Sequence, residues 1–276
     1  MNFQFAAFAD EAGRAPEQQI AAMQRNGISY LEVRFVGGKN VSELTCEEAK
    51  EFRKQLDDGG IKVWSIGSPT GKIKITDPFE PHLDAFRHQL ELADILGATR
   101  YRLFSFYEAY DSFDAVVDRL GQFLDAARGS GVVLCHENEK EIYGDVASRC
   151  VEIHKALPEL RAVFDPANFI QCKQPTLPAW ELLHSYVDYM HIKDCFEDGR
   201  VVPAGDGVGN LPELLRRYSA QGGQVVTLEP HLGKFVGLEK LENGKKSESA
   251  YHFANRDESF DAAANALRRI LAEENG

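Results

Sequence analysis

Eight short apolar runs alternate with longer amphipathic segments along the chain, and this alternation restricts the fold more than any other feature of the sequence. The runs are almost continuously apolar, as are strands that are buried on both faces of a sheet. We expect strands at residues 3–9, 30–34, 61–66, 100–104, 132–136, 162–164, 186–192 and 225–228. Because parallel strands need long crossover connections, the pattern indicates a parallel sheet with a helix after each strand.

The intervening segments have the periodicity of helices. The clearest stripe, with spacings of three and four, consists of Leu83, Phe86, Leu90, Ala93 and Leu96. Thr45 and Glu48 have the spacing of a capping box at the start of a helix. Glycines at positions 27, 60, 97 and 131 fall just after helical segments, where helices commonly end.

Eight strand–helix units of roughly 34 residues each have the size of a (β/α)8 barrel. The rival is a doubly wound open sheet, which usually has a glycine-rich first turn. Here the first turn, residues 9–14, reads Ala-Asp-Glu-Ala-Gly-Arg and has no GxGxxG pattern. We therefore predict an α/β protein with a single (β/α)8 TIM barrel over residues 1–276. A long loop is expected at residues 231–255, either as a functional flap or as a surface insertion.

Charge and cysteine content restrict the partners and the compartment. Acidic residues outnumber basic ones 43 to 31, and a net charge of −12 repels nucleic-acid phosphates and anionic membranes. No apolar stretch approaches the roughly 20 residues that cross a bilayer, and residues 1–10 do not resemble a signal peptide. Five cysteines without CxxC spacing read as reduced thiols. We expect a cytoplasmic protein without nucleic-acid or membrane partners, and a homo-oligomer stays open.

Chemistry in a (β/α)8 barrel takes place at the carboxyl ends of the strands. The polar residues at the expected ends are Asp10, Glu11, Arg34, Ser68, Arg102 to Ser105, Glu137, Asp165, His191 and Glu229. The last four strands thus supply three carboxylates and one imidazole. These carboxylates would repel one another unless a cation lay between them.

An oxygen-rich set with one nitrogen suits Mn²⁺, Mg²⁺, Co²⁺ or Zn²⁺. The four residues are 26 to 38 positions apart, so only the fold would bring them together. Taken singly, each has another reading. Asp165 could cap a turn before Pro166, and Glu137 could be an ordinary loop acid.

Four segments at these strand ends resemble a known family. Residues 132–139, Val-Val-Leu-Cys-His-Glu-Asn-Glu, resemble the fifth-strand motif of the xylose-isomerase-like barrels, and residues 164–168, 190–194 and 228–231 resemble the next three motifs. Residues 203–207 and 211–214 are also typical. The family includes sugar and sugar-phosphate isomerases and epimerases such as tagatose 3-epimerase, hydroxypyruvate isomerase, inosose dehydratase and, more distantly, endonuclease IV.

The resemblance implies one divalent metal ion, manganese foremost, held by Glu137, Asp165, His191 and Glu229. It implies a sugar-derived substrate and a cis-enediolate mechanism, in which Glu137 and Glu229 act as acid and base. A dehydratase on the same site stays open because it begins with the same proton abstraction. A non-catalytic sugar-binding barrel would be expected to have a broken ligand set, and this set is intact.

Nuclease activity is disfavoured by the residues at two strand ends. The endonuclease branch needs additional histidines, whereas strands three and four end with Ser68 and Ser105. The negative net charge also opposes DNA binding.

The chain departs from the family pattern at positions that would contact the substrate. Asn168 stands where some epimerases have a histidine, and no arginine follows the seventh-strand histidine closely. Lys193 shares the strand face of His191 and could substitute. His231 shares the parity of Glu229 and could reach the substrate, or could be a loop histidine. His136 has the opposite parity to Glu137 and should face the helices.

Three basic residues follow strands two, three and four, namely Arg34, Lys72 and Arg102. Together they could bind a carboxylate or phosphate of the substrate. Alternatively they could form ion pairs with neighbouring acids such as Asp10, Glu11 or Glu32. Phe106 and Tyr107 are candidates for the pocket wall, and Trp64 is expected in the core.

Overall fold

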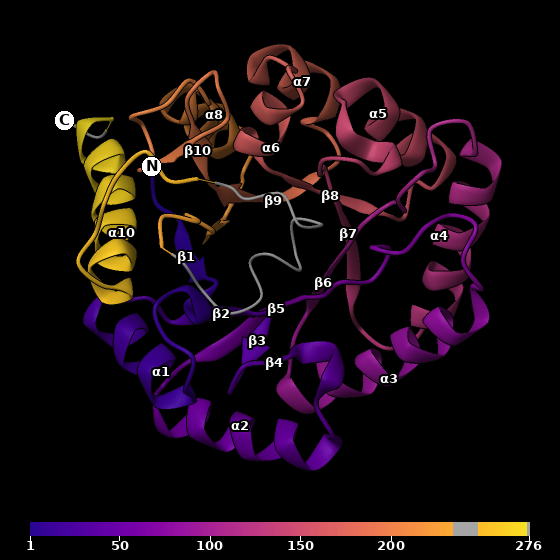
Figure 1. Cartoon of the computed structure of the whole chain (residues 1–276), viewed down its shortest axis with the longest axis horizontal. Helices are drawn as coiled ribbons and strands as arrows, with labels where there is room; N and C mark the ends of the chain where they lie inside the picture. The colour runs from indigo at the N-terminus through magenta and orange to yellow at the C-terminus, as the bar shows by residue number, and fades with distance from the viewer. Residues whose placement is uncertain (234–247, 275–276) are drawn as a thin grey trace.

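The computed structural model describes residues 1–233 and 248–274 and contains a closed barrel of eight parallel strands (Figure 1). The strands lie around the barrel in the order β1-β12-β9-β8-β7-β6-β5-β2. Their bounds are β1 Gln4–Ala7, β2 Tyr30–Val33, β5 Lys62–Gly67, β6 Arg100–Leu103, β7 Val133–Glu137, β8 Arg161–Phe164, β9 Val187–Ile192 and β12 Val225–Leu228. All eight expected strands are present, and the predicted (β/α)8 barrel is confirmed.

The first strand closes the barrel. Gln4 in β1 pairs with Val225 in β12, and Ala6 pairs on the other side with Tyr30 in β2. Helices surround the strands as an outer ring (Figure 1). Their bounds are α1 Pro16–Arg25, α2 Cys46–Asp58, α3 Glu80–Leu96, α4 Phe113–Ala127, α5 Ala147–Ala156, α6 Pro166–Gln171, α7 Thr176–Leu183, α8 Leu211–Ala220 and α10 Arg256–Glu273.

A short antiparallel strand pair lies in each of the connections that follow β2 and β9. The hairpin of β3 (Phe35–Val36) and β4 (Lys39–Asn40) follows β2, and the antiparallel pair β10 (Asp194–Cys195) and β11 (Val201–Val202) follows β9. Single 3-10 turns occur at Ala9–Glu11, Val41–Glu43 and Tyr143–Asp145. The expected loop at 231–255 lies largely outside the described residues, which do not include 234–247.

The capping and packing signals of the sequence act as expected. The Glu48 N–H donates to Thr45 Oγ1 (3.2 Å), and the Thr45 N–H donates to Glu48 Oε2 (2.9 Å), which starts α2. Gly97 ends α3 with a φ of 73°, in the left-handed region that glycine tolerates. The stripe of α3 is buried at every position, so this helix packs on the barrel through the face that the periodicity predicted.

The interior of the barrel is stacked in layers that position the candidate site. Side chains of Cys135, Val163, Tyr189 and Val225 pack together inside the barrel, and the ring of Trp64 packs edge-on against Tyr189. Side chains alternate along a strand, so residues two positions further on point the same way. Residues 137, 165 and 191, each two positions after a member of this layer, therefore also point inward. Residue 229 lies four positions after Val225 and shares its direction.

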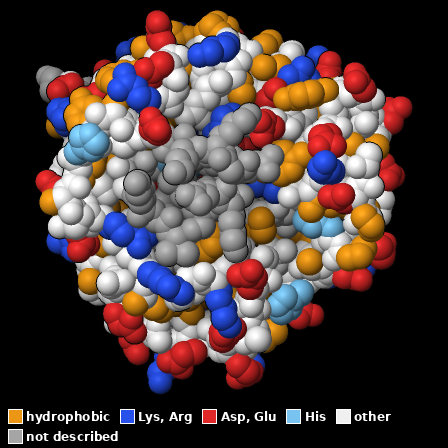
Figure 2. Space-filling view, in the orientation of Figure 1, with side chains coloured by type: hydrophobic (Ala, Val, Ile, Leu, Met, Phe, Trp, Pro, Cys, Tyr) orange, Lys and Arg blue, Asp and Glu red, His pale blue; other side chains and the backbone are white. Residues whose placement is uncertain are grey.

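Among the described residues, no helix is long and apolar enough to cross a membrane. Figure 2 shows acidic and basic side chains interspersed around the described part of the face that it views. The concentrated charge of the molecule lies inside the barrel mouth, as described below.

The loop that bears Lys72 is held by a hydrogen bond to His82, a partly buried histidine, and this contact is predicted to be sensitive to acid. The Gly71 N–H donates to His82 Nε2 (2.9 Å), so that nitrogen must be unprotonated. Burial, with the charge of Arg119 nearby, lowers the pKa of His82 to about 4. The unfolded chain would bind this proton near pH 6.5, so the contribution is complete above pH 6.5 and is lost as the pH falls towards 4.

We therefore expect wild-type protein to lose about 2 kcal/mol of unfolding free energy from this group between pH 7 and pH 4.5, after allowance for the partial exposure of the ring. His82→Gln keeps an acceptor for the Gly71 N–H and does not titrate, so its stability should fall less over the same interval. Urea unfolding of both proteins at the two pH values measures the difference. An identical pH dependence would show that His82 does not contribute.

Candidate metal and catalytic centre

Four side chains from neighbouring strands converge at the carboxyl end of the barrel. They are Glu137, Asp165, His191 and Glu229; all are buried, and one ligand atom from each lies within 4.8 Å of the others. His191 Nδ1 lies 3.1 Å from both Glu137 Oε1 and Glu229 Oε2 and 3.9 Å from Asp165 Oδ2. The structure thus brings together the four residues that the strand ends suggested.

The imidazole of His191 is oriented by a carboxylate that lies deeper in the barrel. His191 Nε2 lies 3.3 Å from Glu32 Oε2, and the hydroxyl of Tyr189 donates to Glu32 Oε1 (2.8 Å). A histidine that binds a metal through one nitrogen commonly donates its other N–H to such a carboxylate. In this arrangement Nδ1 faces the three carboxylates.

Sequence reasoning missed this position of Glu32, which it considered only as an ion-pair partner for the basic residues Arg34, Lys72 and Arg102. A signal was available. Glu32 lies two residues before Arg34 on one strand, so both side chains point into the barrel.

Asp165 both caps a helix and points into the cluster. Its Oδ1 accepts the Asn168 N–H at the start of α6 (2.8 Å), while the side chain of Asn138 bonds the Asp165 N–H and carbonyl, each at 2.9 Å. Within the described chain, Asp165 Oδ2 accepts no hydrogen bond, although Lys193 Nζ lies 2.8 Å away. Capping and metal binding are therefore compatible in this residue.

Positive charge balances the cluster. Lys193 Nζ lies 2.8 Å from Asp165 and 3.2 Å from Glu229. Burial alone would raise the pKa of Glu229, but Lys193 and His191 hold it well below its usual value. Burial, reinforced by Glu229 and Glu137 and only partly opposed by Lys193, raises the pKa of Asp165 to about 7.

His191 responds in the opposite sense. Burial favours the neutral ring, but Glu137, Glu32 and Glu229 outweigh it and raise the pKa of His191 well above its usual value. The negative charge of the carboxylates therefore favours binding of cations at this centre. Three carboxylates and one imidazole nitrogen within 4.8 Å of one another fit a divalent metal ion, which would displace the proton of His191.

Each of the two glutamates in the cluster is paired with an arginine. Arg102 Nε lies 3.1 Å from Glu137 Oε2, and Arg34 Nη1 donates to Glu229 Oε1 (2.9 Å). Arg34 also pairs with Asp10 (3.1 Å) and Glu11 (3.2 Å). The ion-pairing alternative thus describes Arg34, with Asp10 and Glu11 as partners and with Glu229 in addition.

The remaining candidates lie around these pairs. Lys72 Nζ lies 3.1 Å from Glu139 Oε2. Asn168 Nδ2 donates to Glu137 Oε1 (3.2 Å). His231 Nε2 lies 3.5 Å from Glu229 Oε1, and burial, followed by the charge of Lys193, lowers the pKa of His231 to about 4. Asn168 and His231 therefore each contact one of the two glutamates.

Phe106, a candidate for the pocket wall, and His136, which was expected to face the helices, both point away from the centre. Phe106 has a φ of 68° and is completely buried against Phe79 and Phe123, so its assignment to the pocket wall is wrong. His136 bonds Ser105 Oγ through Nε2 (2.9 Å), and its ring lies beside that of His154 in α5. As strand parity predicted, His136 faces the helices.

Comparison with known proteins assigns the barrel to a family. The model of the xylose isomerase-like TIM barrel family matches residues 20–270. The chain belongs to this family. The resemblance inferred from the strand-end motifs of this xylose isomerase-like barrel is thereby confirmed. No curated protein sequence matches the chain at a significant level.

Solved structures share the fold over nearly the whole chain. D-psicose 3-epimerase with D-tagatose from Clostridium cellulolyticum H10 is 16% identical, with a TM-score of 0.75 and coverage of 98% of this chain and 99% of that chain. The probable 3-DHS dehydratase AsbF from Bacillus anthracis is 13% identical (TM-score 0.73; 97% and 99% covered). The IOLI protein with a binding zinc atom is 14% identical (0.73; 99% and 99%). At these identities the likeness shows the common fold of xylose isomerase-like barrels.

Proposed function

We propose that this xylose isomerase-like barrel is a divalent-metal-dependent isomerase or epimerase of a keto sugar. The metal, manganese foremost, would be held by Glu137, Asp165, His191 and Glu229. The observation that supports this most is the placement of two buried glutamates, each 3.1 Å from His191 Nδ1 and each with its own arginine. Two carboxylates beside one metal position are what a two-base proton transfer requires.

In the proposed reaction the metal ion would stabilise negative charge, and the glutamates of the chain would transfer the proton. A divalent ion supplies Lewis-acid stabilisation of the oxyanion that forms when a hydroxyketone loses its α-proton. One glutamate removes that proton and leaves an enediolate. The other returns a proton to the opposite face of the same carbon, which gives the epimer, or to the adjacent carbon, which gives the isomer. No atom is gained or lost overall.

The neighbouring residues would hold the two glutamates ready for this exchange. Arg34 donates a hydrogen bond to Glu229, and Arg102 forms an ion pair with Glu137, so each carboxylate has a cation that would favour one direction. Asn168 steadies Glu137, and His231 and Lys193 lie beside Glu229, where substrate hydroxyls would bind.

The charge balance favours a neutral sugar over a phosphorylated one. Arg34, Lys72 and Arg102 each pair with carboxylates of the chain, so their charge is already balanced. A phosphate would have to compete with those carboxylates for the same donors. We propose a neutral keto sugar as the substrate class.

The absence of disulfide bonds among the five cysteines supports a reducing compartment. All five, Cys46, Cys135, Cys150, Cys172 and Cys195, are free thiols in the structure. Free thiols are usual in the cytosol, where disulfides are rare. We propose a cytoplasmic enzyme of sugar metabolism.

Solvent exchange tests the reaction. Manganese-loaded protein, incubated in D2O with a panel of ketoses and ketose phosphates, should incorporate deuterium at the α-carbon of at least one neutral ketose and form its epimer or aldose. Protein stripped of metal with a chelator is the matched control and should do neither. An ultraviolet-absorbing enone without an epimer would mean a dehydratase instead. Binding without exchange or elimination would mean a sugar-binding barrel.

A further inference from the structure

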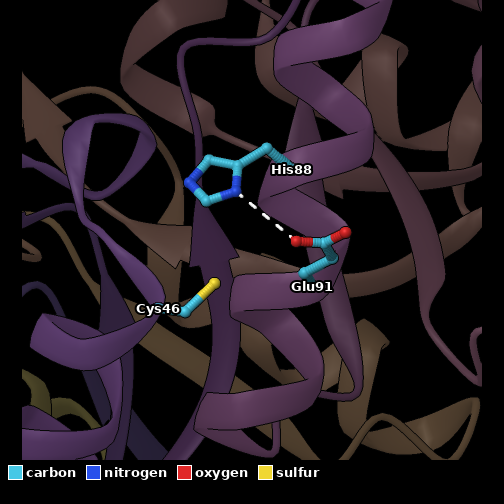
Figure 3. A group of neighbouring side chains, drawn as sticks. All are labelled: Cys46, His88 and Glu91. Atoms are coloured by element: carbon cyan, nitrogen blue, oxygen red, sulfur yellow. Dashed lines mark ion pairs between the residues drawn. The ribbon is translucent and has the colours of Figure 1, made fainter.

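A second group of metal-ligand side chains lies outside the barrel, where α2 and α3 pack together. It consists of Cys46, His88 and Glu91, and one ligand atom from each lies within 4.8 Å of the other two. Cys46 is the first residue of α2, whereas His88 and Glu91 are three residues apart on α3 and so share one face of that helix. Figure 3 shows the sulfur of Cys46 pointing towards the gap between the other two side chains.

The ring of His88 is held in the tautomer that a metal requires. Its Nε2 lies 2.9 Å from the carbonyl oxygen of Leu44, which can only accept a hydrogen bond, so Nε2 is the donor. In the neutral ring Nδ1 is then unprotonated, and it faces Glu91 Oε2 at 3.7 Å. An imidazole whose far N–H is fixed by a backbone carbonyl is the usual arrangement of a metal-binding histidine.

We propose that Cys46, His88 and Glu91 form a second metal site, which takes a borderline divalent cation such as Zn²⁺ and joins the start of α2 to α3. A thiolate selects zinc-like ions over Mg²⁺ or Mn²⁺. A thiolate and a carboxylate together neutralise the two charges of the ion. The partial exposure of Cys46 and His88 leaves room for water as a fourth ligand.

The distances need only a small adjustment. Ligand atoms around tetrahedral zinc are roughly 3.3–3.8 Å apart, given bond lengths of about 2.0–2.3 Å. The ligand atoms lie within 4.8 Å of one another, and His88 Nδ1 and Glu91 Oε2 are already 3.7 Å apart, so the group would contract by at most about 1.5 Å. Glu91 can supply this movement because its side chain is 69% exposed and is not held by packing.

This second site, called the outer site below, shares no residue with the barrel centre of Glu137, Asp165, His191 and Glu229 and does not depend on the proposed function. Its sulfur ligand allows metal binding at the outer site to be measured separately. The four residues of the barrel centre contain no sulfur. A sulfur-to-cobalt charge-transfer band in the near ultraviolet therefore reports only the outer site when Co²⁺ is added. Mn²⁺ binding, in contrast, reports the barrel centre.

Cobalt titration of the full-length protein under reducing conditions tests the proposal. The wild-type protein should develop the charge-transfer band, and the band should saturate when one cobalt ion per chain has bound at the outer site. Cys46→Ser should lose the band and bind at that site more weakly by a factor on the order of 100 or more, and Glu91→Gln by about 10-fold. Cys172→Ser, which removes another partly buried free thiol, is the matched control and should keep the band.

Thermal melting with and without Zn²⁺ gives a second readout. Zinc should raise the Tm of wild type and of Cys172→Ser, but not that of Cys46→Ser, compared with the same proteins in chelator. If Cys46→Ser fails to fold, the exposed Glu91→Gln variant still tests the site by its weakened cobalt affinity. A wild type without the band, a band that persists in Cys46→Ser, or an unchanged affinity in Glu91→Gln would each overturn the proposal.

Discussion

Glu229→Gln and Glu137→Gln should each lower the turnover of the ketose substrate by a factor on the order of 10² or more. An amide cannot accept or return the α-proton, whereas its size preserves much of the packing around each site. Glu137 ends β7 and Glu229 directly follows β12, and in the barrel order β9 and β8 lie between these two strands, so the two carboxylates reach the centre from different directions. Each should therefore serve one face of the substrate.

Exchange without turnover separates the two roles. In a variant that still binds manganese, the remaining glutamate should exchange the proton on its own face, so deuterium should enter from only one epimer. Asp188→Asn is the matched control because it removes a carboxylate from β9 that pairs with Arg100 and leaves the cluster intact. Normal turnover in either glutamine variant would exclude the two-glutamate mechanism.

Removal of ligands from the barrel centre should give a graded loss of manganese affinity. Asp165→Asn and His191→Asn should weaken binding more than 100-fold, because each removes a proposed ligand. Glu32→Gln should weaken it about 10- to 100-fold, because the amide holds the ring of His191 less firmly. Isothermal titration of chelator-treated protein with Mn²⁺ measures the series.

His136→Asn is the control for this series. His136 is a buried histidine on a barrel strand, but it faces Ser105 and the helices, so manganese affinity should be unchanged. Equal affinities across all variants would place the metal elsewhere. A loss in Glu32→Gln as large as that in His191→Asn would mean that Glu32 is itself a ligand.

The strands and the four-residue cluster could be predicted because both follow from local rules. Apolar runs marked the strands, and the last inward side chain of each run marked a strand end. Parity placed His136 outside and Lys193 inside the barrel, where the structure has them. These features can be predicted from the fold class and from the two-residue period of a strand alone.

Other features depend on contacts that no local pattern encodes. The side chain of Phe106 turned into the core because its backbone takes a positive φ. Arg34 could pair with several acids, and only the closed barrel brings Asp10, Glu11 and Glu229 to it together. The hairpins after β2 and β9 have strands of two residues each, too short to show a period.

The position of β1 between β2 and β12 has a consequence for synthesis of the chain. The β1 strand leaves the ribosome long before one of its two neighbours, β12, which begins at Val225. A contact of similar sequence separation lies at the carboxyl end of the barrel, where the His231 N–H donates to Glu11, which lies 220 residues earlier. We therefore expect the nascent chain to expose one unpaired edge of β1 until β12 has been made, and this edge is a binding point for chaperones.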